Sequence, residues 1–173
     1  MEFVRILTLA LAVTASATAL AQNGTTEWQS VVESPREGAG PLTMALVVNE
    51  VGDSIRIYRD ENDIVRGIFT LGDQGYKFEG GSCPTVRVDR LPPHPLVNLG
   101  GPCELENPHV RFTLGVISEG RLQSTMLWQL MNGGGFRVWY PVKDQGYRES
   151  RFSLRRSMNA LVSTLGTEVE VVP

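Results

Sequence analysis

The sequence predicts a mainly β fold, an antiparallel β-sandwich-like domain with one C-terminal amphipathic helix packed on a sheet. Short apolar runs alternate with polar residues at a period of two, and turn residues separate these runs. The pattern changes to a helical period only near the C-terminus. The chain has 173 residues, 42% of them hydrophobic, which is long enough for one domain with its own core.

The N-terminus has the features of a secretory signal peptide in the right order. Arg5 supplies a positive charge, Ile6 to Val13 form an apolar run, and Ala19-Leu20-Ala21 offers small residues to a signal peptidase. We therefore expect removal of residues 1–21 and a periplasmic or secreted protein. The run is shorter than the roughly 20 apolar residues that cross a bilayer, so no membrane span is expected. A buried N-terminal helix is the alternative interpretation.

The mature chain divides into a loose lead-in and one domain. Residues 22–41 have few apolar side chains apart from those of an expected edge strand at Trp28–Val32. A single β-rich domain is expected over residues 42–173. The formal net charge is −3 with both signs interspersed, whereas a nucleic-acid partner calls for a basic stripe. The expected partner is therefore an unknown protein or small ligand, and no nucleic acid.

The expected strands follow from the alternation of apolar and polar residues. The clearest case is Val110 to Val116, where Phe112 and Leu114 share one face and Arg111 and Thr113 the other. Glycines at 133–135 indicate a hairpin between the run at 121–131 and the one at 136–140. The full set of expected strands is 42–49, 54–59, 64–71, 76–79, 85–89, 110–116, 121–131, 136–140 and 167–172.

The acidic stretch Asp60-Glu61-Asn62-Asp63 predicts a hairpin turn, because Asp and Asn favour turns. Carboxylates two residues apart also resemble calcium ligands. A calcium loop of the EF-hand type needs glycine at its sixth position and glutamate at its twelfth, where this chain has Val65 and Leu71. The turn is the better interpretation.

One segment has a helical period. Its apolar residues fall on one stripe of a helix, with Ser153 placed to cap the first turn and Gly166 placed to end the last. Arg155 and Arg156 would lie in the first turn, where the helix dipole disfavours positive charge; pairing with a nearby carboxylate or exposure to water is expected. The stripe consists of Leu154, Met158, Leu161, Val162 and Leu165.

The two cysteines, Cys83 and Cys103, are the only ones in the chain. In an exported protein we expect them to form a disulfide. A zinc site with His94 and His109 is the alternative, but gaps of 11, 9 and 6 residues do not match the close ligand pairs of structural zinc sites. A catalytic cysteine–histidine pair is a third interpretation, although an oxidising compartment consumes free reactive thiols.

A disulfide would close a loop that is rich in proline and glycine. Its prolines disfavour a central strand and keep the backbone extended around His94. The loop over residues 84–102 is therefore the candidate partner-binding segment, with Arg90, Pro92, Pro93, His94 and Pro95 as its candidate residues.

Sequence motifs of catalysis are missing. There is no Gly-x-Ser-x-Gly elbow, no phosphate-binding Gly-x-x-x-x-Gly-Lys-Ser/Thr loop and no His-Glu-x-x-His zinc motif. We therefore expect no catalytic residue, metal or cofactor. An active site assembled by folding from Asp89, Arg90 and His94 stays open, since such sites are recognised by geometry.

Several segments together suggest a family. They are an early Trp28, the sequence FEGGSCP at 78–84 ahead of Val86-Arg87-Val88-Asp89, and the closing helix from Phe152 to Leu161. In this order they resemble the invasion-associated locus B family. The resemblance implies bacterial origin, export and a noncatalytic β-sandwich.

The resulting hypothesis is an exported, noncatalytic β-rich binding or structural protein of the bacterial cell envelope. The alternative is an inhibitor or immunity-type protein that blocks a cell-envelope enzyme through the 84–102 loop. Rigid extended loops suit that role because they lose little entropy on binding.

Overall fold

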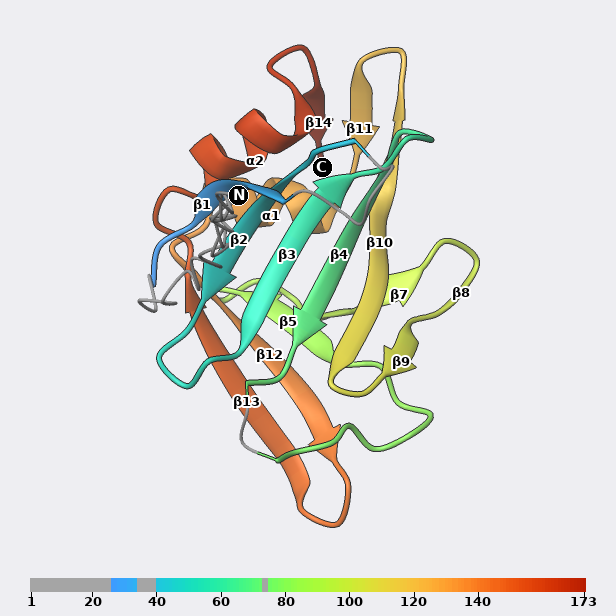
Figure 1. Ribbon diagram of the computed structural model, residues 1–173, viewed down its shortest axis with the longest axis vertical. Helices are drawn as coiled ribbons and strands as arrows, with labels where there is room; N and C mark the ends of the chain where they lie inside the picture. The colour runs from blue at the N-terminus through green and yellow to red at the C-terminus, as the bar shows by residue number, and fades with distance from the viewer. Residues whose placement is uncertain (1–25, 34–39, 73–74) are drawn as a thin grey trace, which may run out of the picture.

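The computed structural model describes residues 26–33, 40–72 and 75–173. The predicted signal peptide lies outside these residues. The described chain is mainly β, as predicted, and its two larger sheets face each other (Figure 1).

The large sheet has the strand order β1-β2-β3-β4-β10-β11-β14, with β9 paired to β10. Its pairs are antiparallel except β11 with β14, which run parallel. The prediction of an antiparallel sheet therefore needs correction at this one edge. The strands are β1 (Gln29–Glu33), β2 (Leu42–Val48), β3 (Ser54–Arg59), β4 (Ile64–Thr70), β9 (Glu104–Glu106), β10 (His109–Ser118), β11 (Arg121–Gln123) and β14 (Glu170–Val172).

The small sheet has the order β13-β12-β5-β6, so β13 and β6 are its edges. A separate hairpin of two short strands follows β6 in the chain. These strands are β5 (Thr85–Val88), β6 (His94–Pro95), β12 (Gly135–Val142), β13 (Gly146–Ser153), and the hairpin pair β7 (Val97–Asn98) and β8 (Gly101–Pro102).

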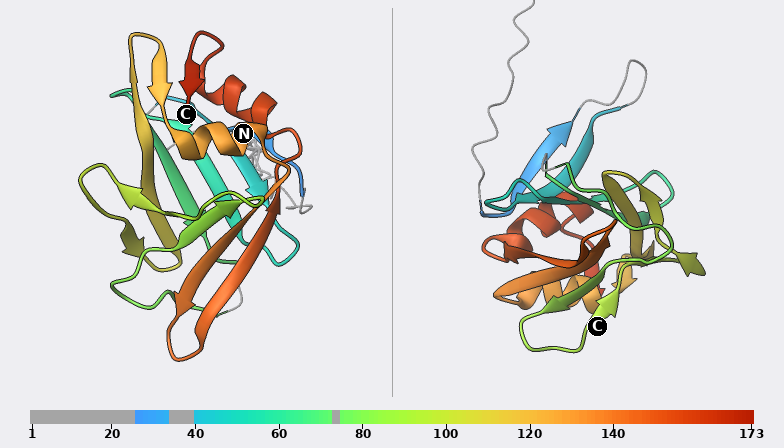
Figure 2. Two further views of the ribbon diagram at one scale, coloured as in Figure 1. Left: turned by 180° about the vertical axis from the view of Figure 1, so that it is seen from behind. Right: turned by 90° about the horizontal axis from the view of Figure 1, so that it is seen from below.

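Two helices, α1 (Thr125–Asn132) and α2 (Ser157–Leu165), occur in the described residues. Both lie on the same face of the large sheet as the small sheet does, as the two views in Figure 2 show. Helix α2 contacts β1, β2 and β3, and α1 packs against α2. The predicted packing of the C-terminal helix on a sheet is confirmed. The predicted apolar stripe is wrong at Met158, which is 45% exposed, and at Leu154, which lies before the helix.

An aromatic cluster fills the space between the sheets. The ring of Phe69 on β4 is 5.3 Å from that of Tyr140 on β12 and 6.3 Å from that of Phe152 on β13, both edge to face. Phe136 stacks on Phe152 with ring centroids 4.9 Å apart. Such pairs stabilise beyond their buried area, so this cluster joins the two layers.

The predicted strand over 121–131 is wrong after residue 123. Helix α1 begins where the Ser124 hydroxyl accepts a hydrogen bond from the Leu127 backbone N–H at 3.3 Å. Leu127 and Leu130, three residues apart, are buried on one helix face. The expected hairpin at 133–135 is therefore a link from α1 to β12.

The start of the C-terminal helix also differs from the prediction. Ser153 belongs to β13, and α2 begins at Ser157, after Arg156 adopts a left-handed φ of 64°. At the end of this strand Ser153 pairs with Gly135, and its carbonyl accepts a hydrogen bond from the Trp28 indole at 3.0 Å. The two arginines bind Glu27, at 3.0 Å from Arg155 and 3.2 Å from Arg156, so the expected pairing with a carboxylate is present before the helix.

Smaller differences affect other strands. The expected strand at 76–79 is reduced to a bridge between Phe78 and Val142. The expected strand at 167–172 covers only Glu170–Val172. The strand β13 (Gly146–Ser153) was not predicted, because of its two buried residues, Ser150 and Phe152, only one is apolar.

Replacing Gly67 with alanine tests how closely the inner faces are packed. A Cβ at Gly67 would overlap the ring of Phe112, its cross-strand neighbour. We expect Gly67→Ala to lower the free energy of unfolding by about 1–3 kcal/mol through overpacking, measured by urea denaturation. Gly80→Ala, which meets nothing within 4 Å, should be neutral; equal values for both variants would contradict this packing.

Candidate functional site

The 84–102 segment is anchored by a disulfide. The sulfur atoms of Cys83 and Cys103 are 2.14 Å apart, with Cys103 buried in the core. The segment contains β5 to β8 rather than a loop without partners. His94 pairs with Val86, so the prolines tolerate a two-residue strand, at the sheet edge where proline is allowed.

Most of the predicted partner-binding residues are exposed. Arg90, Pro92, Pro93 and Pro95 face solvent, while His94 is only half-buried. The same segment also exposes Leu91 by 40%, Val97 by 40% and Leu99 by 60%. These apolar residues were not among the predicted partner-binding residues. The sequence signal that could have found them is the presence of leucines in a proline-rich segment, where a buried strand is disfavoured.

His94 lies beside a small cavity of about 260 Å³ between the sheets. Phe112, Leu114 and Met126 contribute apolar walls, and the N-cap residue Ser124 also lines it. The Nε2 atom of His94 is buried and has no hydrogen-bond partner among the described residues. The imidazole therefore faces a mainly apolar space and contacts no carboxylate.

The residues of the alternative sites do not converge. His109 Nδ1 is hydrogen-bonded with the Thr70 hydroxyl at 3.0 Å. The Asp89 carboxylate accepts hydrogen bonds from the backbone N–H groups of Gly134 and Gly135, both at 3.0 Å. Within the described part of the chain, no group of three or more His, Cys, Asp or Glu side chains is arranged to hold a metal ion.

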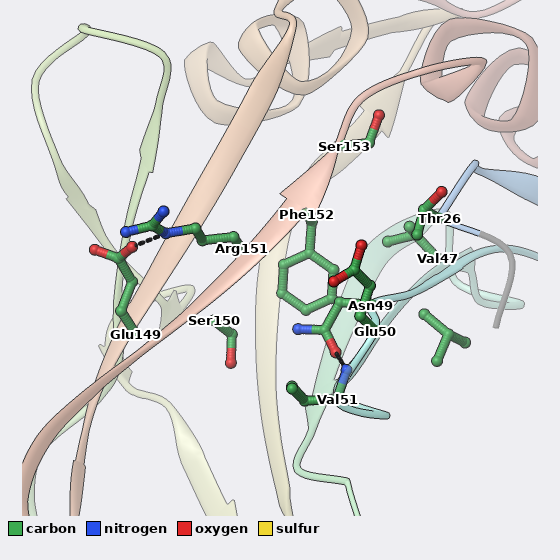
Figure 3. A pocket seen from close by; sticks show the side chains of 11 residues that line it. Thr26, Val47, Asn49, Glu50, Val51, Glu149, Ser150, Arg151, Phe152 and Ser153 are labelled. Carbon is green, nitrogen blue, oxygen red and sulfur yellow. Dashed lines mark hydrogen bonds and ion pairs between the residues drawn. The ribbon is translucent and has the colours of Figure 1, made fainter.

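A cleft of about 480 Å³ lies where the end of β2 approaches the edge strand β13. Figure 3 shows Ser150 and Phe152 on one side of it and Val47, Asn49 and Val51 on the other. Sequence reasoning missed this cleft, because the two segments are about 100 residues apart in the chain.

A buried polar network adjoins the cleft. The Asp53 carboxylate accepts hydrogen bonds from the Gly72 backbone N–H at 2.7 Å and from the Ser150 hydroxyl. Ser150 is also hydrogen-bonded with the Tyr140 hydroxyl at 3.2 Å, and burial raises the pKa of Tyr140. Ser150 is 2% exposed and has no imidazole base beside it, so the network ties the sheets together rather than forming a nucleophile.

The acidic turn binds arginine. Asp60 accepts hydrogen bonds from the backbone of Asn62 and Ile64 and binds Arg66 at 2.6 Å. Asp63 binds Arg59 at 2.7 Å. The predicted hairpin turn is confirmed, since β3 and β4 are its antiparallel arms.

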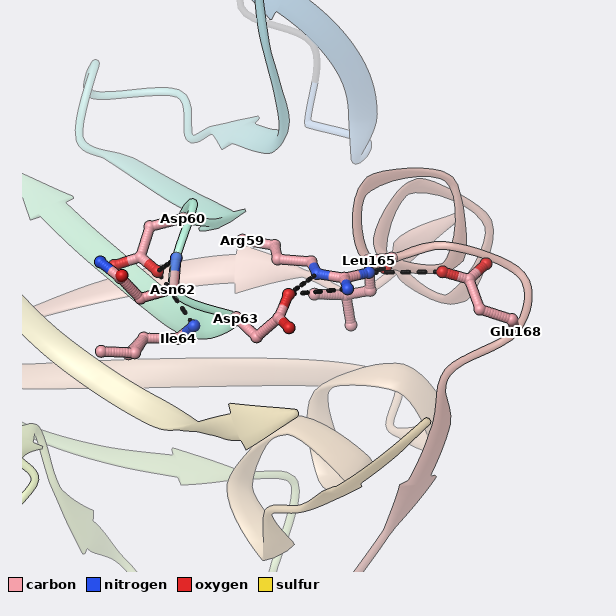
Figure 4. A network of polar contacts seen from close by, with 7 residues as sticks. All are labelled: Arg59, Asp60, Asn62, Asp63, Ile64, Leu165 and Glu168. Carbon is pink, nitrogen blue, oxygen red and sulfur yellow. Dashed lines mark hydrogen bonds and ion pairs between the residues drawn. The ribbon is translucent and has the colours of Figure 1, made fainter. Parts of the chain in front are cut away.

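The same turn is linked to the C-terminal helix. Arg59 also donates a hydrogen bond to the carbonyl oxygen of Leu165 at 2.9 Å and binds Glu168 at 3.3 Å (Figure 4). A last-turn carbonyl of α2 is thereby satisfied by a cation, which the helix dipole favours. The carboxylates of this turn therefore bind arginines of the same chain and stabilise the fold.

These features define a β protein with two larger facing sheets and an exposed segment that is closed by a disulfide. No helix in that part of the chain is long and apolar enough to cross a membrane. No family model and no curated protein matches the sequence.

The structure is similar to the crystal structure of invasion associated protein B from Bartonella henselae. The TM-score is 0.52 at 11% sequence identity, and the match covers 80% of this chain and 90% of that one. At this identity the likeness shows the fold alone.

The Asp60 turn predicts a pH dependence of stability. Burial opposes ionisation of the carboxyl, but hydrogen bonds from Arg66, Ile64 and Asn62 outweigh it and lower the pKa below the ordinary 3.8. A lowered folded-state pKa stabilises the fold at neutral pH, and this contribution is lost as the pH falls below 3.8. We expect Asp60→Asn to be less stable than wild type at pH 7, with the difference narrowing in acid.

Urea denaturation of both proteins across this pH range measures the effect. Glu61→Gln is the matched control, since Glu61 is exposed in the same turn. A constant difference between wild type and Asp60→Asn down to the lowest pH would contradict the role of the Asp60 charge.

Removing the Cys83–Cys103 disulfide should lower the stability of the protein without changing its fold. The disulfide joins residues 20 apart, and closing a loop of this size stabilises by about 3 kcal/mol in the chain-entropy model. We expect the double variant Cys83→Ser, Cys103→Ser to lose about this free energy of unfolding, with its far-UV circular dichroism retained. An unchanged free energy of unfolding would contradict the chain-entropy argument for this disulfide.

Proposed function

We propose that this chain is an exported, noncatalytic binding protein of the bacterial cell envelope, with the 84–102 loop as its partner-binding surface. The observation that carries the proposal is the apolar surface of a covalently anchored loop. Leu91, Val97 and Leu99 are strongly exposed beside the exposed prolines 92, 93 and 95. Contiguous patches of exposed apolar residues mark interaction surfaces, and these three residues lie close together in the chain.

The loop is held in place before any partner arrives. The disulfide fixes its two ends, and the Leu96 backbone N–H donates to the Pro84 carbonyl at 2.8 Å across it. Leu96, 1% exposed, anchors its middle in the core. A surface of this kind loses little conformational entropy on binding.

Export is supported by three observations of different kinds. The N-terminal sequence has the charge, apolar run and small residues of a signal peptide. Disulfides persist in oxidising compartments, and both cysteines are bonded to each other. The structural neighbour, named as invasion associated, is compatible with an envelope protein.

The same loop supports the alternative of an inhibitor or immunity-type protein. A rigid, exposed loop can occupy an enzyme cleft without large rearrangement. In that case the partner is a cell-envelope enzyme, and its activity falls when this protein is added.

Loop variants test the proposal on a captured partner. The protein is coupled to a support, envelope extract is passed over it, and the affinity of each captured protein is then measured. We expect the double variant Leu91→Ser, Leu99→Ser to weaken binding of the true partner at least tenfold, as loss of central apolar contacts does. Val116→Ser, which removes a side chain of similar exposure (43%) from β10, should leave the affinity unchanged.

The result also separates the competing functions. Equal affinities for all three proteins would remove the loop from consideration. Turnover of a substrate that is lost in His94→Ala would replace the binding proposal with an enzyme.

A further inference from the structure

The outer face of the small sheet carries a row of three arginines. Arg137 on β12 lies directly opposite Arg151 on β13 and Arg87 on β5. Their neighbours Val86, Val138 and Phe152 are buried inward, so the arginines point to the other face. Figure 2, left, looks onto the side of the molecule where this sheet lies in front of the large one.

Like charges directly opposite each other destabilise a sheet, and this row has few carboxylates to offset them. Glu149 binds Arg151 and lies 3.9 Å from Arg137. Burial opposes its ionisation, but these two arginines outweigh that effect and lower the pKa of Glu149. The row therefore has three positive charges against one negative, in a chain whose formal net charge is −3.

Arg87 has no carboxylate partner among the described residues. Its guanidinium lies over the ring of Trp139, 5.2 Å from the centroid, and its Nε is buried without a hydrogen-bond partner. A cation–π contact orients a guanidinium while leaving its N–H groups free for a planar anion. The Trp139 ring therefore positions the Arg87 guanidinium, while its positive charge is not neutralised by a carboxylate.

The large sheet provides a contrast within the same molecule. Its outward arginines each have a carboxylate of their own: Arg56 with Glu33 at 3.9 Å, Arg66 with Asp60 at 2.6 Å and Arg111 with Glu106 at 3.2 Å. Arginine on an outer sheet face is therefore normally paired in this protein. The surplus of positive charge is specific to the small sheet.

We propose that the row of Arg87, Arg137 and Arg151 is a binding site for an acidic polysaccharide. The guanidinium groups would hold carboxylate, phosphate or sulfate groups of the glycan through paired N–H donors. Arg87 lies on β5, within the 84–102 segment but before its exposed apolar residues Leu91, Val97 and Leu99. The proposal does not rest on the function proposed for those residues.

The chemistry of the face favours a glycan over other anions. Three adjacent strands span about 10 Å, which suits one or two acidic sugars and is short for a nucleic-acid backbone. No aliphatic side chain is strongly exposed on β5, β12 or β13, so the exposed apolar surface of this face is aromatic. The exposed Tyr147 and the half-buried Trp139 add flat apolar surface with polar edges, against which sugar rings can stack.

Titration calorimetry with heparin and with polygalacturonate tests the site, with neutral dextran as the blank. We expect wild-type protein to bind both acidic glycans at low salt. The double variant Arg87→Gln, Arg137→Gln should weaken this binding at least tenfold. Glu149→Gln should strengthen it several-fold, because the carboxylate that pairs with Arg137 and Arg151 is removed.

Two matched variants complete the experiment. Arg121→Gln removes an exposed arginine that binds Glu170 at 3.1 Å on another sheet, and it should bind as wild type does. The loop variant Leu91→Ser, Leu99→Ser should also bind glycan normally, so this proposal and the function proposed for the loop can fail separately. Circular dichroism checks that each variant is folded.

Three outcomes would overturn the proposal. One is the absence of glycan binding by folded wild-type protein. Another is an equal loss in Arg121→Gln, which would mean that total charge alone matters. The third is tighter binding of polyglutamate or of phosphatidylglycerol vesicles than of either glycan, which would assign the row to an acidic peptide or a membrane.

Discussion

The packing of Phe69 against the aromatic rings of the small sheet is the contact on which the rest of the structure depends. Phe69 lies on a central strand of the large sheet and touches Phe78, Tyr140 and Phe152. Strand residues alternate between two faces, so fixing these rings inward also fixes which side chains point outward. The arginine row and the stapled loop owe their positions to this inner layer.

The sequence was sufficient to predict an element where its apolar alternation and its turn residues indicated the same structure. The run at 110–116 lies within β10 (His109–Ser118), and the acidic turn joins β3 to β4. The predicted alternation of the run fails at its end, because a bulge between Thr113 and Gly115 turns Val116 outward. It was insufficient for Thr125–Asn132, because a short apolar run fits a buried strand and a helix equally well. In the structure the Ser124 hydroxyl caps this segment as a helix. Before α2, the Ser153 carbonyl accepts a hydrogen bond from Trp28, a contact between residues far apart in the sequence.

The two candidate surfaces differ in how far sequence could predict them. The loop was predictable, since the chain has only two cysteines and the prolines lie between them. Two arginines of the row alternate with apolar neighbours, in Val86-Arg87-Val88 and Phe136-Arg137-Val138, which indicates an outward position on a strand. Their alignment depends on the register of strands about 50 residues apart, and no local signal reports register.

Strand β5 connects the two surfaces. It carries Arg87 outward, begins just after Cys83, and leads into the exposed part of the loop. The two surfaces nevertheless differ in chemistry. Binding at the arginine row would be electrostatic and would weaken as salt screens the charges. Burial of Leu91 and Leu99 would be driven by the hydrophobic effect, which does not weaken with salt. A protein built this way can hold a charged polymer on one face while its loop engages a second partner, and ionic strength would separate the two interactions.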